Sequence, residues 1–159
     1  MRMRFQDRVI ELTRQAGEDL FRTARAVPPD RLTWRPLEMG RSVLDILQEC
    51  AQQPAFLPRL LTPASPPLSP EMRAALREER AQWTTIDACE EAYRRNLEAA
   101  VQAIREVPDE RLDEVVSLPF RPGVTRTIAQ ILLTVYWQLV YHTGQVNYIQ
   151  TLYGDREMH

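Results

Sequence analysis

The last part of the chain carries one apolar pattern that strongly constrains the fold. From Ile128 to Tyr153 its positions step alternately by four and three residues, which places them on one side of a helix packed in a bundle. They are Ile128, Leu132, Val135, Leu139, His142, Val146, Ile149 and Tyr153. The pattern predicts a long helix that begins at Thr127 and has one histidine in its buried seam.

Three earlier segments show the same helical spacing of apolar residues. The first stripe extends from Phe5 to Val27 and is followed by two prolines, which end a helix. The second begins at Ser42, a predicted N-cap with Asp45 three residues later. The third extends from about Thr85 to Val107. The sequence therefore predicts an all-α fold, a four-helix bundle.

A long proline-rich segment separates the second and third predicted helices. Six prolines occur between Pro54 and Pro70, and proline fixes its own φ and lacks an amide donor. We expect a loop here, followed by a short helical stretch at Glu71–Glu79. Such a connection lets the two middle helices run parallel, which favours an up-down-down-up topology. A second irregular segment, with Pro122 and Gly123, is expected before the last helix.

Length and composition limit the class of protein. A chain of 159 residues is the size of one ordinary domain, and we expect a single domain over residues 1–159. Its net charge of -2 excludes the basic surface that nucleic-acid binding needs. The longest apolar stretch is too short to span a membrane, and no signal peptide opens the chain. A cytoplasmic protein is therefore expected, with no nucleic-acid or membrane partner.

Two stretches of the sequence resemble the DinB-like family. The first extends from Val27 to Pro36 and leads through Arg41 into the predicted second helix. The second is Tyr141–Ile149, which contains a histidine-x-Gly-Gln motif and is followed by Leu152-Tyr-Gly. Their order and separation also fit, so the resemblance covers nearly the whole chain.

The resemblance implies a metal site between the second and last helices. In that family three histidines hold a divalent metal, commonly zinc or nickel, and the matching positions here are Glu49, Gln138 and His142. One of the three histidines is retained. The resemblance thus implies either a site in which these three side chains hold zinc or nickel, or a degenerate site that has lost its metal.

The residue types at these positions leave two interpretations open. Gln138 and His142 are four residues apart on one helix face, so both could touch an ion held also by Glu49. An uncharged amide oxygen is a weak ligand for zinc. Alternatively, Glu49 and Gln138 satisfy the two ring nitrogens of His142 in a buried polar network without an ion. Both interpretations predict that the three side chains meet.

Two functions remain open at this stage. The first is a non-catalytic DinB-like protein with a degenerate metal site that binds a small ligand or a protein partner. The alternative is a metal-dependent transferase or hydrolase that acts on a small electrophile, with a thiol as co-substrate. The aromatic residues Trp137, Tyr141 and Tyr148 lie on one flank of the last helix, where they form either core or the interface of a homodimer.

Overall fold

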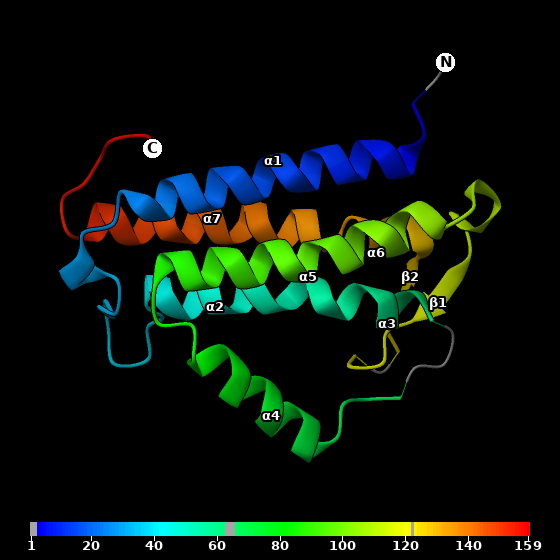
Figure 1. Ribbon diagram of the computed structural model, residues 1–159, viewed down its shortest axis with the longest axis horizontal. Helices are drawn as coiled ribbons and strands as arrows, with labels where there is room; N and C mark the ends of the chain where they lie inside the picture. The colour runs from blue at the N-terminus through cyan, green and yellow to red at the C-terminus, as the bar shows by residue number, and fades with distance from the viewer. Residues whose placement is uncertain (1–2, 63–65, 122) are drawn as a thin grey trace.

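The computed structural model describes residues 3–62, 66–121 and 123–159 of the chain. Four helices, labelled α1, α2, α5 and α7 in Figure 1, lie side by side as a bundle. The helix α4 and a two-stranded hairpin lie outside this bundle. The elements are α1 (Phe5–Arg25), α2 (Val43–Gln52), α3 (Leu57–Leu61), α4 (Pro70–Ala81), α5 (Ile86–Glu106), β1 (Val115–Ser117), β2 (Thr125–Thr127), α6 (Ile128–Leu132) and α7 (Thr134–Leu152). The prediction of an all-α four-helix bundle is confirmed.

Hydrogen bonds between α1 and α5 show that these two helices are antiparallel. Gln6 Nε2 donates to the carbonyl oxygen of Val107 at 2.9 Å. Tyr93 Oη donates to the carbonyl oxygen of Thr13 at 3.3 Å. The beginning of α1 therefore lies at the end of α5, and both helices bury an apolar stripe between them.

The two middle helices of the bundle, α2 and α5, run parallel. Gln48 Nε2 donates to the carbonyl oxygen of Trp83 at 3.0 Å, just before α5 begins. Further along both helices, Asn96 Nδ2 donates to the carbonyl oxygen of Ala51 at 2.8 Å. Figure 1 shows α1 and α7 running in one direction and α2 and α5 in the other. This is the up-down-down-up arrangement that the long connection favours.

The loop predicted from Pro54 to Pro70 is wrong in its first part. A 3-10 turn at Gln53–Phe56 and the helix α3 continue directly from α2. Pro54 and Pro58 lie in the first turns of these elements, where the missing amide donor costs no hydrogen bond. Pro63 lies outside the described residues. The helix α4 is longer than predicted, because Ser69 caps its first turn by accepting from the amide of Met72.

The segment before the last helix contains a hairpin that the sequence does not predict. Strands β1 and β2 pair antiparallel, with Val115 opposite Thr127. Three-residue strands are too short for an alternating pattern to stand out. Gly123 has a φ of 78°, which suits the left-handed turn between them, whereas Pro122 lies outside the described residues. The predicted helix does begin after Thr127, but Leu133 divides it into α6 and α7.

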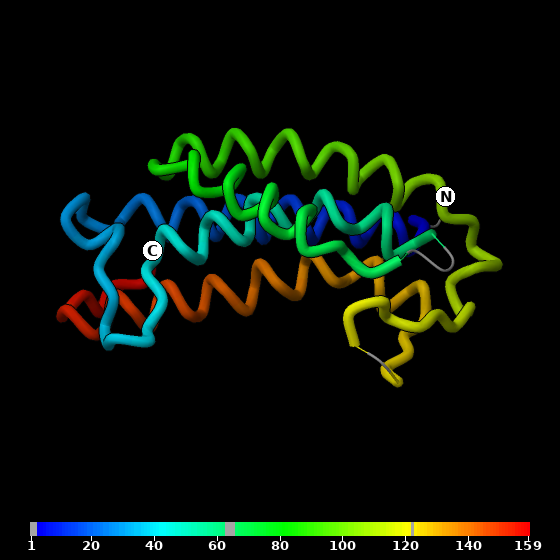
Figure 2. The backbone as a smooth tube through the Cα atoms, turned by 90° about the horizontal axis from the view of Figure 1, so that it is seen from below, coloured from blue at the N-terminus to red at the C-terminus, as the bar shows by residue number. Residues whose placement is uncertain are grey.

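One continuous apolar core lies between the four bundle helices. All of them contribute large side chains that are almost completely buried, among them Leu20, Ile46, Leu47, Ile104, Ile128, Leu132 and Leu139. Seen along the second view (Figure 2), α7 runs along one edge of the bundle. Over the described residues, no helix has both the length and the apolar character that a membrane span requires.

Candidate functional site

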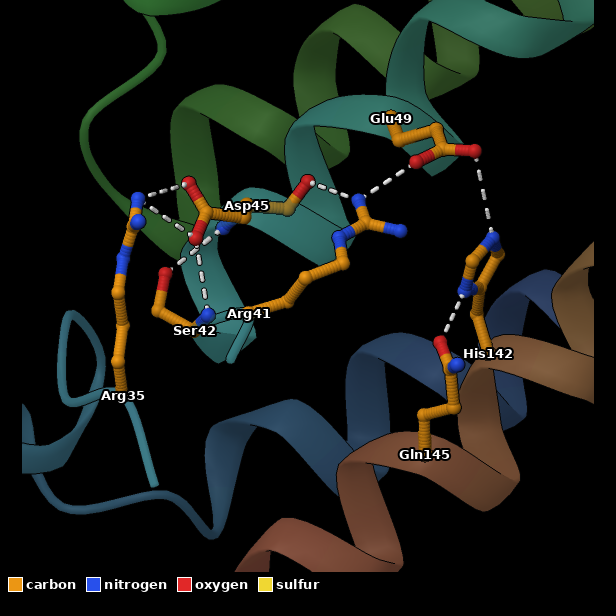
Figure 3. Close-up of polar contacts among 7 residues, drawn as sticks. All are labelled: Arg35, Arg41, Ser42, Asp45, Glu49, His142 and Gln145. Atoms are coloured by element: carbon orange, nitrogen blue, oxygen red, sulfur yellow. Dashed lines mark hydrogen bonds and ion pairs between the residues drawn. The ribbon is translucent and has the colours of Figure 1, made fainter. Parts of the chain in front are cut away.

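Two helices position the acid and the imidazole of the candidate site. Helix α2 starts at a capping box in which Ser42 Oγ accepts from the amide of Asp45, and the carboxylate of Asp45 accepts from the amide of Ser42. This fixed start directs Glu49, two turns later, toward α7. On α7, His142 is 3% exposed and lies among the apolar residues of the seam. Figure 3 shows the two side chains facing each other across the helix interface.

Both nitrogens of the His142 ring face polar side chains, but only Nδ1 is within hydrogen-bond distance of its neighbour. Its Nδ1 lies 2.7 Å from Oε1 of Gln145, one turn further along α7. Its Nε2 lies 3.6 Å from Oε1 of Glu49. That separation is beyond ordinary hydrogen-bond length, and the buried Nε2 has no hydrogen-bond partner among the described residues.

The Glu49 carboxylate lies against the Nε2 edge of the His142 ring. With the amide oxygen of Gln145 at Nδ1, that nitrogen must donate a hydrogen. Nε2 then presents either a proton or a lone pair to the Glu49 carboxylate, and a lone pair there is repelled by the negative charge.

The second oxygen of Glu49 is bound by Arg41. Arg41 Nη2 lies 2.5 Å from Oε2 of Glu49 and donates to the carbonyl oxygen of Asp45 at 3.1 Å. Asp45 in turn forms an ion pair with Arg35 at 3.1 Å. Figure 3 shows this chain of polar contacts extending from the start of α2 to α7. Glu49 is therefore shared between a guanidinium and an imidazole.

These contacts keep Glu49 ionised. The contact with His142 and the charge of Arg41 lower the pKa of Glu49 to about 2, against an opposing effect of partial burial. A carboxylate with so low a pKa is a poor general acid or base near neutral pH, because it takes up a proton only under strongly acidic conditions. The arrangement suits binding and positioning more than proton transfer.

Gln138, the third predicted site residue, faces a different part of the molecule. No hydrogen bond joins it to His142 or Glu49 among the described residues. Its side chain lines a cavity of about 490 Å³ near Trp137 and Phe120, beside the hairpin. The expected meeting of three side chains is thus found for Glu49 and His142, and Gln145 takes the place predicted for Gln138 as the second partner of the ring.

The donor set does not fit a zinc or nickel ion. Within the described ranges, no group of three or more His, Cys, Asp or Glu side chains comes together. Glu49 and His142 supply two of the four ligands that zinc normally takes, and Arg41 already neutralises the carboxylate. A divalent ion would have to lie close to a guanidinium that is always charged.

A polar cavity opens beside Glu49, on the side away from His142. Its volume is about 400 Å³. Both charge signs are represented in its walls, which consist of Arg35, Met39, Gly40, Arg41, Asp45, Gln48, Glu49 and Arg80. Arg35 and Arg41 are neutralised by acidic neighbours, whereas Arg80 forms no ion pair within the described part of the chain. The free guanidinium gives the cavity a position for an anionic group.

Arg41, Gln145 and Arg80 are the functional candidates that the sequence reasoning missed. Gln145 belongs to the quoted histidine-x-Gly-Gln motif and lies three residues after His142, which is contact distance on a helix. That spacing could have identified it. Arg41 and Arg80 precede α2 and end α4, so their meeting at one cavity depends on the tertiary fold.

Comparisons with known proteins agree with the architecture. A search of curated proteins finds no match to this chain. The sequence profile of the DinB superfamily matches residues 12–146, which include α2, most of α7 and both residues of the Glu49–His142 pair. The match covers well over half of the sequence, and the chain therefore belongs to the DinB superfamily.

Proposed function

We propose that this protein is a non-catalytic member of the superfamily that binds a small polar ligand beside Glu49 without using a metal. The observation that carries the proposal is that both oxygens of Glu49 already face protein groups, Arg41 at one oxygen and the His142 ring at the other. The Arg41 guanidinium thus stands where a metal ion would neutralise the carboxylate. The low pKa of Glu49 supports the same proposal, because it keeps the carboxylate charged for both partners.

The walls of the cavity indicate the class of ligand. They are mostly polar or charged, so a ligand needs hydrogen-bonding groups over most of its surface. Arg80 offers a guanidinium without an acidic partner, which favours a carboxylate or phosphate group on the ligand. We therefore expect a small polar anion, with Arg80 as its main charged contact and Arg41 oriented by Glu49.

Titration with simple anions tests this proposal. Acetate and inorganic phosphate are added to isotopically labelled protein, and amide shifts around the cavity are followed by NMR. We expect saturable shifts near Arg41 and a loss of affinity of about ten-fold in Arg80→Gln. Arg77→Gln, one turn earlier on α4 and outside the cavity lining, is the matched control and should bind like wild type. Absence of saturable binding, or equal loss in both variants, would overturn the proposal.

A metal-dependent enzyme is the second candidate function, and one observation favours it. Within the described part of the chain the buried Nε2 of His142 has no hydrogen-bond partner, and it lies 3.6 Å from Glu49 Oε1. Two ligands of a tetrahedral ion at about 2.0 Å are roughly 3.3 Å apart, which is close to this spacing.

Metal analysis distinguishes the two candidates. The protein is dialysed against zinc or nickel and then against buffer, and the bound metal is counted per chain. We expect wild type to retain no more metal than His142→Ala. One ion per chain in wild type, absent from both His142→Ala and Glu49→Gln, would support the enzyme and refute the metal-free proposal.

A further inference from the structure

The outward side of α7 is unusual because it carries no charged residue. Between Thr134 and Leu152 the sequence has no Asp, Glu, Lys or Arg. Several large apolar and aromatic side chains on this side are about half exposed or more: Trp137 (59%), Val140 (49%), Tyr141 (51%), Tyr148 (65%) and Leu152 (46%). Together with Gly144, these residues are called the outer face of α7. A contiguous exposed apolar face of this kind indicates an interaction surface.

Two aromatic residues of the outer face stack on each other. The rings of Trp137 and Tyr141 stack at a centroid distance of 5.3 Å and an interplanar angle of 17°. Tyrosine and tryptophan are enriched in protein interfaces, where they supply contact area at a small cost in side-chain entropy. The stack therefore presents a preformed flat surface to whatever covers it.

Gly144 lies in the middle of this face and packs against no neighbouring helix among the described residues. A Cβ built on Gly144 meets nothing within 4 Å, whereas a Cβ on Gly17 would lie 2.3 Å from Tyr93 Oη. A glycine inside a helix is destabilising relative to alanine, and no close helix crossing within the described residues offsets that loss at Gly144. The free space lies on the outside, where a second helix could approach.

The spacing of the outer face around Gly144 is nearly symmetrical. Tyr141 lies three residues before Gly144 and Tyr148 four residues after it. Trp137 lies seven residues before and Leu152 eight residues after. A two-fold axis near Gly144 would thus place Tyr141 against Tyr148 of the partner subunit and Trp137 against Leu152 of the partner subunit. Two-fold symmetry requires a self-complementary surface of this kind.

We propose that two copies of this chain associate through the outer face of α7, as an antiparallel helix pair that crosses at Gly144. A second copy is the occupant that this face fits best, because a charge-free surface would leave the charges of a charged partner desolvated and unpaired. Antiparallel packing also opposes the two helix dipoles favourably. The rest of the surface is rich in charged residues and suits contact with water.

Sedimentation equilibrium over a range of protein concentrations tests the association. Gly144→Leu should leave the monomer folded, since its Cβ has free space, and should weaken dimerisation by at least about ten-fold. Ala75→Leu places the same side chain at an exposed position of α4 and should dimerise like wild type. Circular dichroism checks that both variants fold. A wild-type protein that stays monomeric at about 0.1 mM, or equal behaviour of the two variants, would overturn the proposal.

Cross-linking tests the antiparallel geometry separately. An equimolar mixture of Tyr141→Cys and Tyr148→Cys should form a disulfide-linked dimer on mild oxidation, and each variant alone should link poorly. The native Cys50 and Cys89 are buried and free, so they should not compete. If each variant links efficiently with itself and the mixture gives no additional product, the helices are parallel and the proposed geometry is wrong.

Discussion

Helices α5 and α7 belong to the same bundle, but their outward sides differ. The outward side of α5 carries many charged residues, and several form ion pairs with α1. Arg25 of α1 contacts both Asp87 and Glu90, and Arg14 contacts Glu98 at 3.3 Å. The outer face of α7 carries none. The residue types on the outward side of a helix thus differ with what that side contacts. For α5 this is water, and for α7, in our proposal, it is a second copy of the chain.

The inward side of α7 differs from that of α5 in carrying two buried polar side chains, His142 and Gln150, of which Gln150 donates to the carbonyl oxygen of Thr23. The buried residues of α5 are apolar apart from the hydroxyl of Tyr93, which donates to α1. On α7 an imidazole lies in the seam and is matched by Glu49 from α2. A polar side chain in a packed core is retained at a cost in stability unless it is paired. The pair therefore identifies the interface of α2 and α7 as the place to look for function.

The largest loss of stability is expected from a substitution on the inward side of α7, and it tests the difference between the inward and outward sides of this helix. Leu139 is 1% exposed, and Leu139→Ala should lower the free energy of unfolding by about 2–5 kcal/mol, because it leaves a cavity in the core. Its neighbour Val140 is 49% exposed, and Val140→Ala should cost less than about 0.5 kcal/mol. Urea unfolding at low protein concentration measures both. Similar losses in the two variants would contradict the inward and outward assignment.

A smaller effect is expected at the buried imidazole. His142→Ala removes one partner of Glu49 and leaves a polar gap in the seam, which should cost about 1–3 kcal/mol. Gln145 is partly exposed, so Gln145→Ala should cost about 1 kcal/mol or less. Urea unfolding at neutral pH gives both values. If His142→Ala is as stable as wild type, the contact between His142 and Glu49 contributes nothing to the free energy of unfolding.

The dependence of stability on pH should reveal the charge of Glu49. Folding lowers the pKa of this carboxyl from 4.5 to about 2, so its contribution is complete above pH 4.5 and is lost as the pH falls toward 2. Partial exposure reduces this contribution to on the order of 1 kcal/mol. The difference in unfolding free energy between wild type and Glu49→Gln should therefore shrink between pH 6 and pH 3. A constant difference would show that Glu49 is not held in its ionised form.

The smallest effect is expected on the charged surface between α1 and α5. Arg14 and Glu98 form an exposed ion pair, with side-chain exposures of 45% and 68%. Arg14→Ala should cost at most about 1 kcal/mol, and 1 M salt should remove most of that difference. Thermal unfolding at low and high salt measures it. A large loss of stability in Arg14→Ala that is unchanged by salt would contradict the assignment of this ion pair to the solvent-exposed surface.

The sequence predicts the bundle well because apolar spacing follows helix geometry directly. The seam through Leu139 and His142 and the N-cap at Ser42 are found where they were expected. The hairpin was not predicted, because its strands are only three residues long. The helical turns after α2 were missed because Pro54 and Pro58 occupy first-turn positions, where proline does not end a helix.

The candidate site could be predicted only in part. The resemblance brought Glu49 and His142 together, and the structure places them 3.6 Å apart. Gln138 and Gln145 are both near His142 on the helix, and spacing alone does not decide which one rotates toward the ring. Arg41 reaches Glu49 from the residue before the N-cap, a contact set by the path of the chain into α2.

NMR of the imidazole nitrogens tests the central claim, that Glu49 is held by Arg41 and the His142 ring rather than by a metal. The chain has two histidines, so the spectrum is simple, and His159, paired with Asp155 at 2.8 Å, serves as the internal reference. We expect the nitrogen signals of His142 to be unchanged when one equivalent of zinc or nickel is added. A shift of the Nε2 signal to a metal-bound position, reversed by a chelator, would contradict the account.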